Sequence, residues 1–215
     1  IHLNGHNFTG TQAQFLFGYA SNSCVMGNGI VANGKNSAAS GAVIWNTGTK
    51  TNVSIHLYGG TYTVTADNTK GSAIAIQNNG GEIHIHKGVK VIGSATAPAI
   101  YVGISNLRTS ELYITGATVE GTIQIKDLAT AKGFSTTVTV TDSVVDAVEL
   151  GKDVSFTLAG DTGIGKLTVA SGAKFTVGAL GDNAMITVAG DGVVSEANAN
   201  MAAYINCFKP YSGNL

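Results

Sequence analysis

The sequence predicts an all-β fold, a right-handed parallel β-helix of about seven to eight coils with a short C-terminal capping segment. Three observations lead to this prediction. Stretches of alternating apolar and polar residues recur along the chain, turn-forming residues separate them, and a repeat keeps them in step. The composition agrees, because 29 of the 215 residues are Gly and residue types that helices prefer, such as Glu, Lys and Arg, are scarce.

Two families of predicted strands carry this pattern. The first alternates strictly, as in Val53-Ser54-Ile55-His56-Leu57, and we expect strands of about 4 to 6 residues with one buried face. Its members are residues 53–57, 82–86, 111–114, 137–141 and 155–158. The second family lies between them, at residues 42–45, 73–76, 99–102, 122–125 and 147–150.

The spacing of equivalent residues indicates stacked coils. Ile55, Ile83 and Leu112 are separated by 28 and 29 residues. A strand-only unit of this length fits one turn of a parallel β-helix, whereas an antiparallel sandwich would not keep both strand families in step. Crossover connections between parallel strands favour a right-handed coil.

The period then shortens to 19 residues. This spacing is expected to align Phe156 with Phe175, Leu167 with Ile186, and Ala170 with Ala189. The longer, earlier coils are expected to place their extra residues in surface loops, where insertions cost little free energy.

The ends of the chain give a domain assignment. Residues 1–194 are expected to form the β-helix, and residues 195–215 a cap or tail within the same domain. A short helix is expected to start with Ser195 as its N-cap, with Phe208 on its apolar side, and to cover the open edge of the last coil. Because the chain begins inside a predicted strand, we expect it to be a portion of a longer protein.

Charge and cysteine content exclude several classes of protein. Only 12% of residues are charged and the net charge is −1, so no nucleic-acid partner is expected. No apolar run approaches the roughly 20 residues of a membrane-spanning helix. Cys24 and Cys207 lie near opposite ends of the predicted coil stack, so two separate thiols are expected, with Cys24 pointing inward.

The first ten residues carry a resemblance. Ile1-His2-Leu3-Asn4-Gly5-His6-Asn7-Phe8-Thr9-Gly10 resembles the opening strand–turn–strand motif of pectate-lyase-like right-handed β-helix repeats. Such repeats are common in large secreted or wall-bound proteins of Gram-positive and gut bacteria. The resemblance implies an extracellular or cell-surface protein, an adhesin or carbohydrate-contacting module. The same fold also hosts polysaccharide lyases and hydrolases, so the site must decide between these functions.

An enzymatic site would need groups that the sequence supplies sparsely. Lyases of this fold need clustered carboxylates for Ca²⁺ with an Arg or Lys base, and hydrolases need paired carboxylates. The chain has one Arg, Arg108, and its densest acidic group is Asp142, Asp146 and Glu149, near which Lys126 and Lys152 could lie. We expect this group to be a solvated turn, so no catalytic residue, cofactor or metal is assigned.

The candidate site is instead an outer ladder of aromatic side chains. If Ile55, Ile83 and Leu112 stack inward, then His56, His84 and Tyr113 stack on the outer face, with Tyr58 and His86 as a neighbouring column. Three interpretations stay open: sheet stabilisation by cross-strand pairs, contact with a glycan or protein partner, and metal binding by three His.

The function expected from the sequence is therefore a non-catalytic extracellular module that binds a glycan or a cell-surface protein, or serves as a structural stalk. We expect it to be a monomer. The alternative is a polysaccharide-active lyase or hydrolase of the same fold. A deep groove with converging carboxylates and Arg108 or Lys would favour the enzyme, and a shallow strip around the outer ladder would favour binding.

Overall fold

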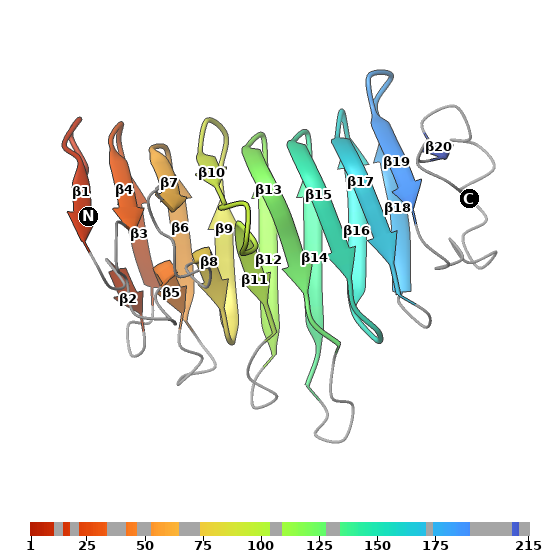
Figure 1. Cartoon of the computed structure of the whole chain (residues 1–215), viewed down its shortest axis with the longest axis horizontal. Helices are drawn as coiled ribbons and strands as arrows, with labels where there is room; N and C mark the ends of the chain where they lie inside the picture. The colour runs from red at the N-terminus through yellow and green to blue at the C-terminus, as the bar shows by residue number, and fades with distance from the viewer. Residues whose placement is uncertain are drawn as a thin grey trace.

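The computed structural model describes residues 1–10, 15–17, 22–33, 42–46, 53–64, 74–103, 109–127, 134–170, 174–189 and 208–210. All regular secondary structure in these residues is β-strand, and every strand pairing is parallel. The strands follow one another in chain order along the long axis of the molecule, from β1 near the N-terminus to β19 and β20 near the C-terminus (Figure 1). The prediction of an all-β fold with parallel strands is confirmed.

The strands form two sheets. The first has seven strands, each of which pairs with the equivalent strand of the next repeat. Its members, in spatial order, are β3 (Asn22–Met26), β6 (Ser54–Tyr58), β9 (Gly81–Ile85), β12 (Ser110–Thr115), β14 (Thr136–Thr141), β16 (Ser155–Gly160) and β18 (Lys174–Leu180). Five of these strands match the first predicted family, and their sequential parallel pairing is compatible with the predicted β-helix.

The second sheet has thirteen strands and begins as two separate rows. One row is β1 (Phe8–Gly10), β4 (Ile30–Asn33), β7 (Thr61–Val64) and β10 (Lys90–Ile92). The other is β2 (Phe15–Phe17), β5 (Ala42–Asn46), β8 (Ile74–Asn78) and β11 (Ile100–Val102). Both rows join the long strand β13 (Thr118–Ile125) and continue as β15 (Val144–Leu150), β17 (Gly163–Val169), β19 (Met185–Ala189) and β20 (Phe208–Pro210).

The predicted inward ladder is present in the seven-stranded sheet. Ile55 pairs with Ile83 and Ile83 with Leu112, as the 28- and 29-residue spacing predicted. Phe156 pairs with Phe175, which confirms the shorter period in this sheet. The ladder is solvent-inaccessible at its described positions, so each repeat adds apolar area to one continuous core.

Turns between the rows depend on glycine and asparagine. Gly60 has a φ of 85°, and a Cβ at this position would lie 2.9 Å from Leu3 Cδ1, so only glycine fits without a shift. Asn78 is buried and satisfies three backbone groups: its amide donates to the carbonyl oxygens of Gly81 and Glu111, and its Oδ1 accepts from Gly80 N–H. The turn residues predicted from composition therefore act as tight corners.

The predicted 19-residue alignment is wrong in the second sheet. Ile186 pairs with Ile164 and Leu167 pairs with Val188, so Leu167 does not align with Ile186. Residues 181–184 separate β18 from β19, whereas only residues 161–162 separate β16 from β17, so β19 begins later than a 19-residue period predicts. One extra residue of β17 between Ile164 and Leu167 then shifts the register by one position. Ala189 consequently pairs with Thr168, not with Ala170.

Two further expectations concern the ends. Phe208 lies in β20, which pairs with β19, so at this residue the edge is covered by a strand and not by the apolar side of a helix. This pairing places residues 208–210 at the end of the thirteen-stranded sheet. The expected helix start at Ser195, together with Cys207 and Arg108, lies outside the described residues.

Candidate functional site: the outer ladder

The outer ladder comprises His56, Tyr58, His84, His86 and Tyr113. In the strand register, His56 pairs with His84 and His84 with Tyr113. Successive side chains of a strand point to opposite faces, and the intervening residues Ile55 and Leu57 are buried, so the rings lie on the outer face. The structure thus brings together all five residues that the sequence predicted to be neighbours.

The five rings form two stacks of nearly parallel planes. In the first stack, the ring centroids of His56 and His84 are 4.3 Å apart with planes 10° from parallel, and those of His84 and Tyr113 are 4.7 Å apart at 14°. In the second stack, the centroids of Tyr58 and His86 are 4.1 Å apart at 8°. Such stacks form because rings at successive repeats are held one strand spacing apart.

A hydrogen bond between two imidazoles joins the stacks. Nδ1 of His56 lies 2.9 Å from Nε2 of His86, and the two ring planes differ by only 16°. The other nitrogen of His56, Nε2, lies 3.0 Å from the hydroxyl oxygen of Ser54. Both ring nitrogens of His56 therefore have partners within the protein, which fixes the orientation of this ring.

Carboxylates flank the first stack on the same face. His84 Nε2 lies 3.0 Å from Glu82 Oε2, and the Tyr113 hydroxyl donates a hydrogen bond to Glu111. Glu82 and Glu111 pair with each other in the register and continue the column that contains Ser54. Sequence reasoning missed these two carboxylates, although their position two residues before His84 and Tyr113 places them on the same face of each strand.

The ladder environment shifts three pKa values. Burial, followed by the proximity of His84 and His86, lowers the pKa of His56 below its ordinary value of 6.5. Burial and the proximity of His84 lower the pKa of His86 in the same direction. The hydrogen bond to Glu111 is the main cause that raises the pKa of Tyr113 to about 12.

The stacking determines which atoms a ligand can reach. Ring faces between neighbouring members of a stack are covered by each other, so the ladder presents ring edges with their N–H, nitrogen and hydroxyl groups. Tyr58 is the most exposed member, with 48% of its surface accessible. In the described residues no group of three or more His, Cys, Asp or Glu is arranged to hold a metal ion.

Cys24 joins this face, contrary to the expectation that it points inward. It pairs with His56 in the register and is partly exposed, while its neighbour Val25 is fully buried and pairs with Leu57. The inward position of this repeat is taken by Ser23, which pairs with Ile55. The short run Asn22–Met26 has no strict apolar alternation, so its sequence did not reveal the direction of Cys24.

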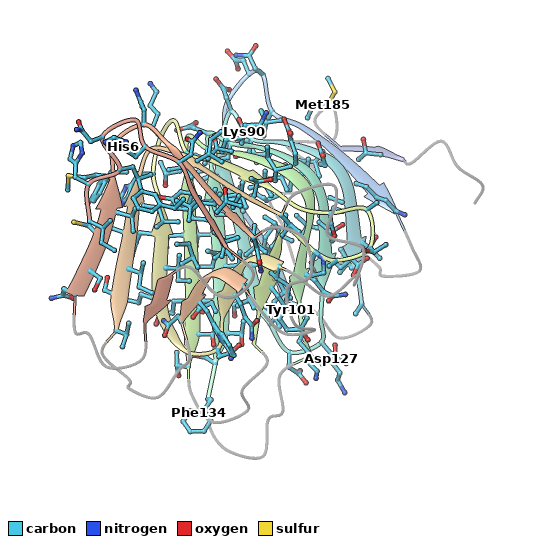
Figure 2. The ribbon with its side chains drawn as sticks, turned by 60° about the vertical axis from the view of Figure 1, so that its left-hand side comes forward. His6, Lys90, Tyr101, Asp127, Phe134 and Met185 are labelled. Carbon is cyan, nitrogen blue, oxygen red and sulfur yellow. The ribbon has the colours of Figure 1, made fainter. Side chains whose placement is uncertain are left out.

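A hollow lies on the outer face of the thirteen-stranded sheet, apart from the outer ladder. It has a volume of about 440 Å³, and its floor includes the in-register side chains of Tyr101, Gln124 and Glu149. Lys126 and Asp127 border it, and Figure 2 shows Tyr101 and Asp127 near each other on the lower part of the molecule. The sequence analysis did not predict a hollow here, although it expected Lys126 to lie near Glu149, and both residues line it.

The two acidic residues of this hollow, and the other members of the acidic group predicted from the sequence, each have their own hydrogen bonds. Glu149 Oε2 accepts from Gln124 Nε2 at 2.8 Å, and Asp127 Oδ1 accepts from Lys152 N–H at 2.7 Å. Asp146 accepts from Gly121 N–H at 2.8 Å, and Asp142 from Asp161 N–H at 2.8 Å. The group predicted from the sequence, Asp142, Asp146 and Glu149, therefore bonds to three separate parts of the chain.

Comparison with known proteins finds no family, no curated protein and no solved structure that matches this sequence. The resemblance of the first ten residues to pectate-lyase-like repeats stays a prediction. Within the described part of the chain, no helix has the length and apolar character needed to cross a membrane.

Proposed function

We propose that the chain is a right-handed parallel β-helix and acts as a non-catalytic, extracellular binding module. The fold proposal is supported by rows of parallel strands that recur in chain order, because right-handed crossovers are the rule for parallel strands in one sheet. The outer ladder is the proposed contact surface, and a glycan or a cell-surface protein is the proposed partner. The pectate-lyase-like resemblance supports the cell-surface setting.

One observation carries the functional proposal: five rings with polar edges are gathered on one face of a sheet whose later strands carry Thr in the same column. His84 and Tyr113 continue in the register as Thr139 and Thr157. Thr is an ordinary exposed strand residue, so the fold itself does not require a ring at these positions.

The ring geometry refines the expected binding mode. A sugar stacked on a ring needs an open ring face, and neighbouring rings cover each other in both stacks. The exposed edges instead offer Nδ1 of His84, Nδ1 of His86 and the Tyr58 hydroxyl, which are not hydrogen-bonded within the described residues and can donate to or accept from the hydroxyl groups of a glycan. The proposed contact is therefore a row of hydrogen bonds along the ladder, with Tyr58 as the most exposed ring.

Glycan-array binding of the chain and of a His56→Ala/Tyr113→Ala variant tests this proposal. We expect the variant to lose the binding of the unmodified chain. A Tyr101→Ala variant is the matched control, because it removes one ring from the hollow on the other sheet and leaves the ladder intact. Binding that is unchanged by the double substitution, or no binding of any glycan or cell-surface protein, would overturn the proposal.

The hollow at Tyr101 supports a second candidate function, a polysaccharide-active enzyme. Its lining contains Lys126, Asp127 and Glu149, the residue types that lyases and hydrolases use. Against this candidate, each carboxylate already accepts a hydrogen bond from the chain itself. Release of unsaturated sugars from pectin or alginate, abolished in a Glu149→Gln variant, would favour the enzyme over the binding module.

A further inference from the structure

The His56–His86 hydrogen bond depends on protonation. A neutral imidazole has one N–H donor and one nitrogen acceptor, whereas a protonated imidazole has two donors. The bond of 2.9 Å between Nδ1 of His56 and Nε2 of His86 therefore needs at least one neutral ring. When both rings are protonated, two N–H groups and two positive charges face each other, and the bond is replaced by repulsion.

His84 increases this sensitivity. Its ring centroid is 4.3 Å from that of His56 and 6.2 Å from that of His86, so three imidazoles share a small part of the outer face. Like charges at such separations oppose one another, and each proton that the cluster takes up makes the next one less favourable.

The charged and titratable neighbours offer limited compensation. Glu82, on β9, favours protonation of His56, but its carboxylate is already hydrogen-bonded to His84. Glu111, on β12, accepts from the Tyr113 hydroxyl. On the β3 side lie Cys24 and the N-terminal ammonium of Ile1, which donates a hydrogen bond to the Cys24 carbonyl oxygen. The other titratable neighbours are Tyr58 on β6 and Lys87 in the turn after β9.

We propose that the His56–His86 pair is a pH-sensitive contact that joins the two ring stacks at neutral pH and separates them in mild acid. Separation moves His86 and the stacked ring of Tyr58 away from the first stack. The consequence for ligand binding rests on the proposed function: a neutral glycan bound along the assembled ladder is released as the pH falls.

The direction of the pKa shifts supports this order of events. Burial and neighbouring imidazoles lower the pKa of both His56 and His86 from 6.5, so both rings stay neutral at pH 7 and the bond between them persists. An unperturbed imidazole would begin to take up protons at a higher pH.

NMR titration of the ring signals in the 215-residue chain, from about pH 8 to about pH 4.5, tests the proposal without any ligand. We expect His56 and His86 to titrate with midpoints below 6.5, and the Tyr58 ring signals to move with the same midpoints. Midpoints at or above 6.5, or Tyr58 signals that do not follow the two imidazoles, would overturn it.

A His86→Phe variant is the matched control, because it keeps a ring in the Tyr58 stack and removes the group that takes up the proton. Its Tyr58 signals are expected to be insensitive to pH over the same range, and a Tyr58 titration identical to that of the unmodified chain would contradict the proposal. A His6→Gln variant, which changes an exposed imidazole outside the ladder, is expected to titrate at Tyr58 like the unmodified chain.

Binding measured at pH 7.5 and at about pH 5 then separates the two proposals. A titrating pair in a chain that binds no glycan or protein supports the pH-sensitive contact and overturns the proposed function. A chain that binds equally at both pH values, with His56 and His86 midpoints at or above 6.5, overturns the pH-sensitive contact and leaves the proposed function standing.

Discussion

The two halves of the seven-stranded sheet share one inner face and differ on the outer face. In both halves the inner column is apolar, from Ile55 and Ile83 in β6 and β9 to Val138 and Phe156 in β14 and β16. The outer column changes from rings to Thr139 and Thr157 after Tyr113. The inner ladder thus runs through both halves, whereas the outer ladder, the proposed contact surface, is present only in the first half.

The largest predicted effect concerns the inner face of both halves. Leu112→Ala and Phe156→Ala each delete a fully buried side chain, and each is expected to lower the free energy of unfolding by about 3–5 kcal/mol. Urea unfolding at pH 7.5 measures both. A loss below about 1 kcal/mol in either half would show that the inner ladder is not one continuous core.

The next largest effect on stability is expected at Asn78, at a corner of the thirteen-stranded sheet. Asn78 occupies a row that continues as Val102, Ile125 and Leu150, so the first half has a buried amide where the second half is apolar. Asn78→Val is expected to lower the free energy of unfolding by about 1–3 kcal/mol in total, because it leaves buried backbone groups without a partner. Calorimetry and urea unfolding check this value, and a neutral or stabilising effect would mean that the three Asn78 hydrogen bonds contribute nothing net.

The two halves are also expected to differ in how their stability depends on pH, because the first half carries His56 and His86. His56 and His86 bind protons less readily in the folded state than in the unfolded state, because their folded pKa values are lowered. Their contribution to the free energy of unfolding is therefore fully present above pH 6.5. It falls as the pH drops below 6.5 and levels off below the folded pKa values. Urea midpoints from pH 8 downward measure the loss, which a His56→Thr/His86→Thr variant is expected to reduce. An equal loss in that variant would place the acid sensitivity elsewhere.

The smallest predicted effect concerns the last ring before the Thr column. Glu111→Gln removes the carboxylate that is the main cause of the raised pKa of Tyr113. The pKa is expected to fall from about 12 toward the ordinary value of 10, with little change in stability because both side chains are partly exposed. Ultraviolet titration of tyrosinate follows the shift, and an unchanged Tyr113 titration would rule out Glu111 as its cause.

Strict alternation made the first sheet predictable. Ile55, Ile83 and Leu112 pair as their spacing predicted, and the outward neighbours His56, His84 and Tyr113 follow by geometry. The row that contains β4, β7 and β10 was not predicted, because its strands are only three or four residues long. Its signal was nevertheless present in Thr61-Tyr62-Thr63-Val64, where Tyr62 and Val64 are buried and the two Thr are not.

Register at the corners could not be read from residue type. Leu167-Thr168-Val169 and Ile186-Thr187-Val188 have the same pattern, yet the longer turn before β19 and one extra residue of β17 near Gly165 change the pairing. The geometry of the rings could not be predicted from the sequence either. The sequence predicted which rings are neighbours, but not that His56 forms a hydrogen bond with His86 or that neighbouring ring faces cover one another. Those features depend on side-chain rotamers, which strand spacing alone does not determine.

The most direct test extends the Thr column through the first half with a His56→Thr/His84→Thr/Tyr113→Thr variant. Partner binding and urea unfolding are measured on the same preparation at pH 7.5. We expect the variant to keep its cooperative unfolding and to lose the glycan or cell-surface-protein binding that is proposed for the unmodified chain. Binding that persists in a folded variant would contradict the assignment of the outer ladder as the contact surface.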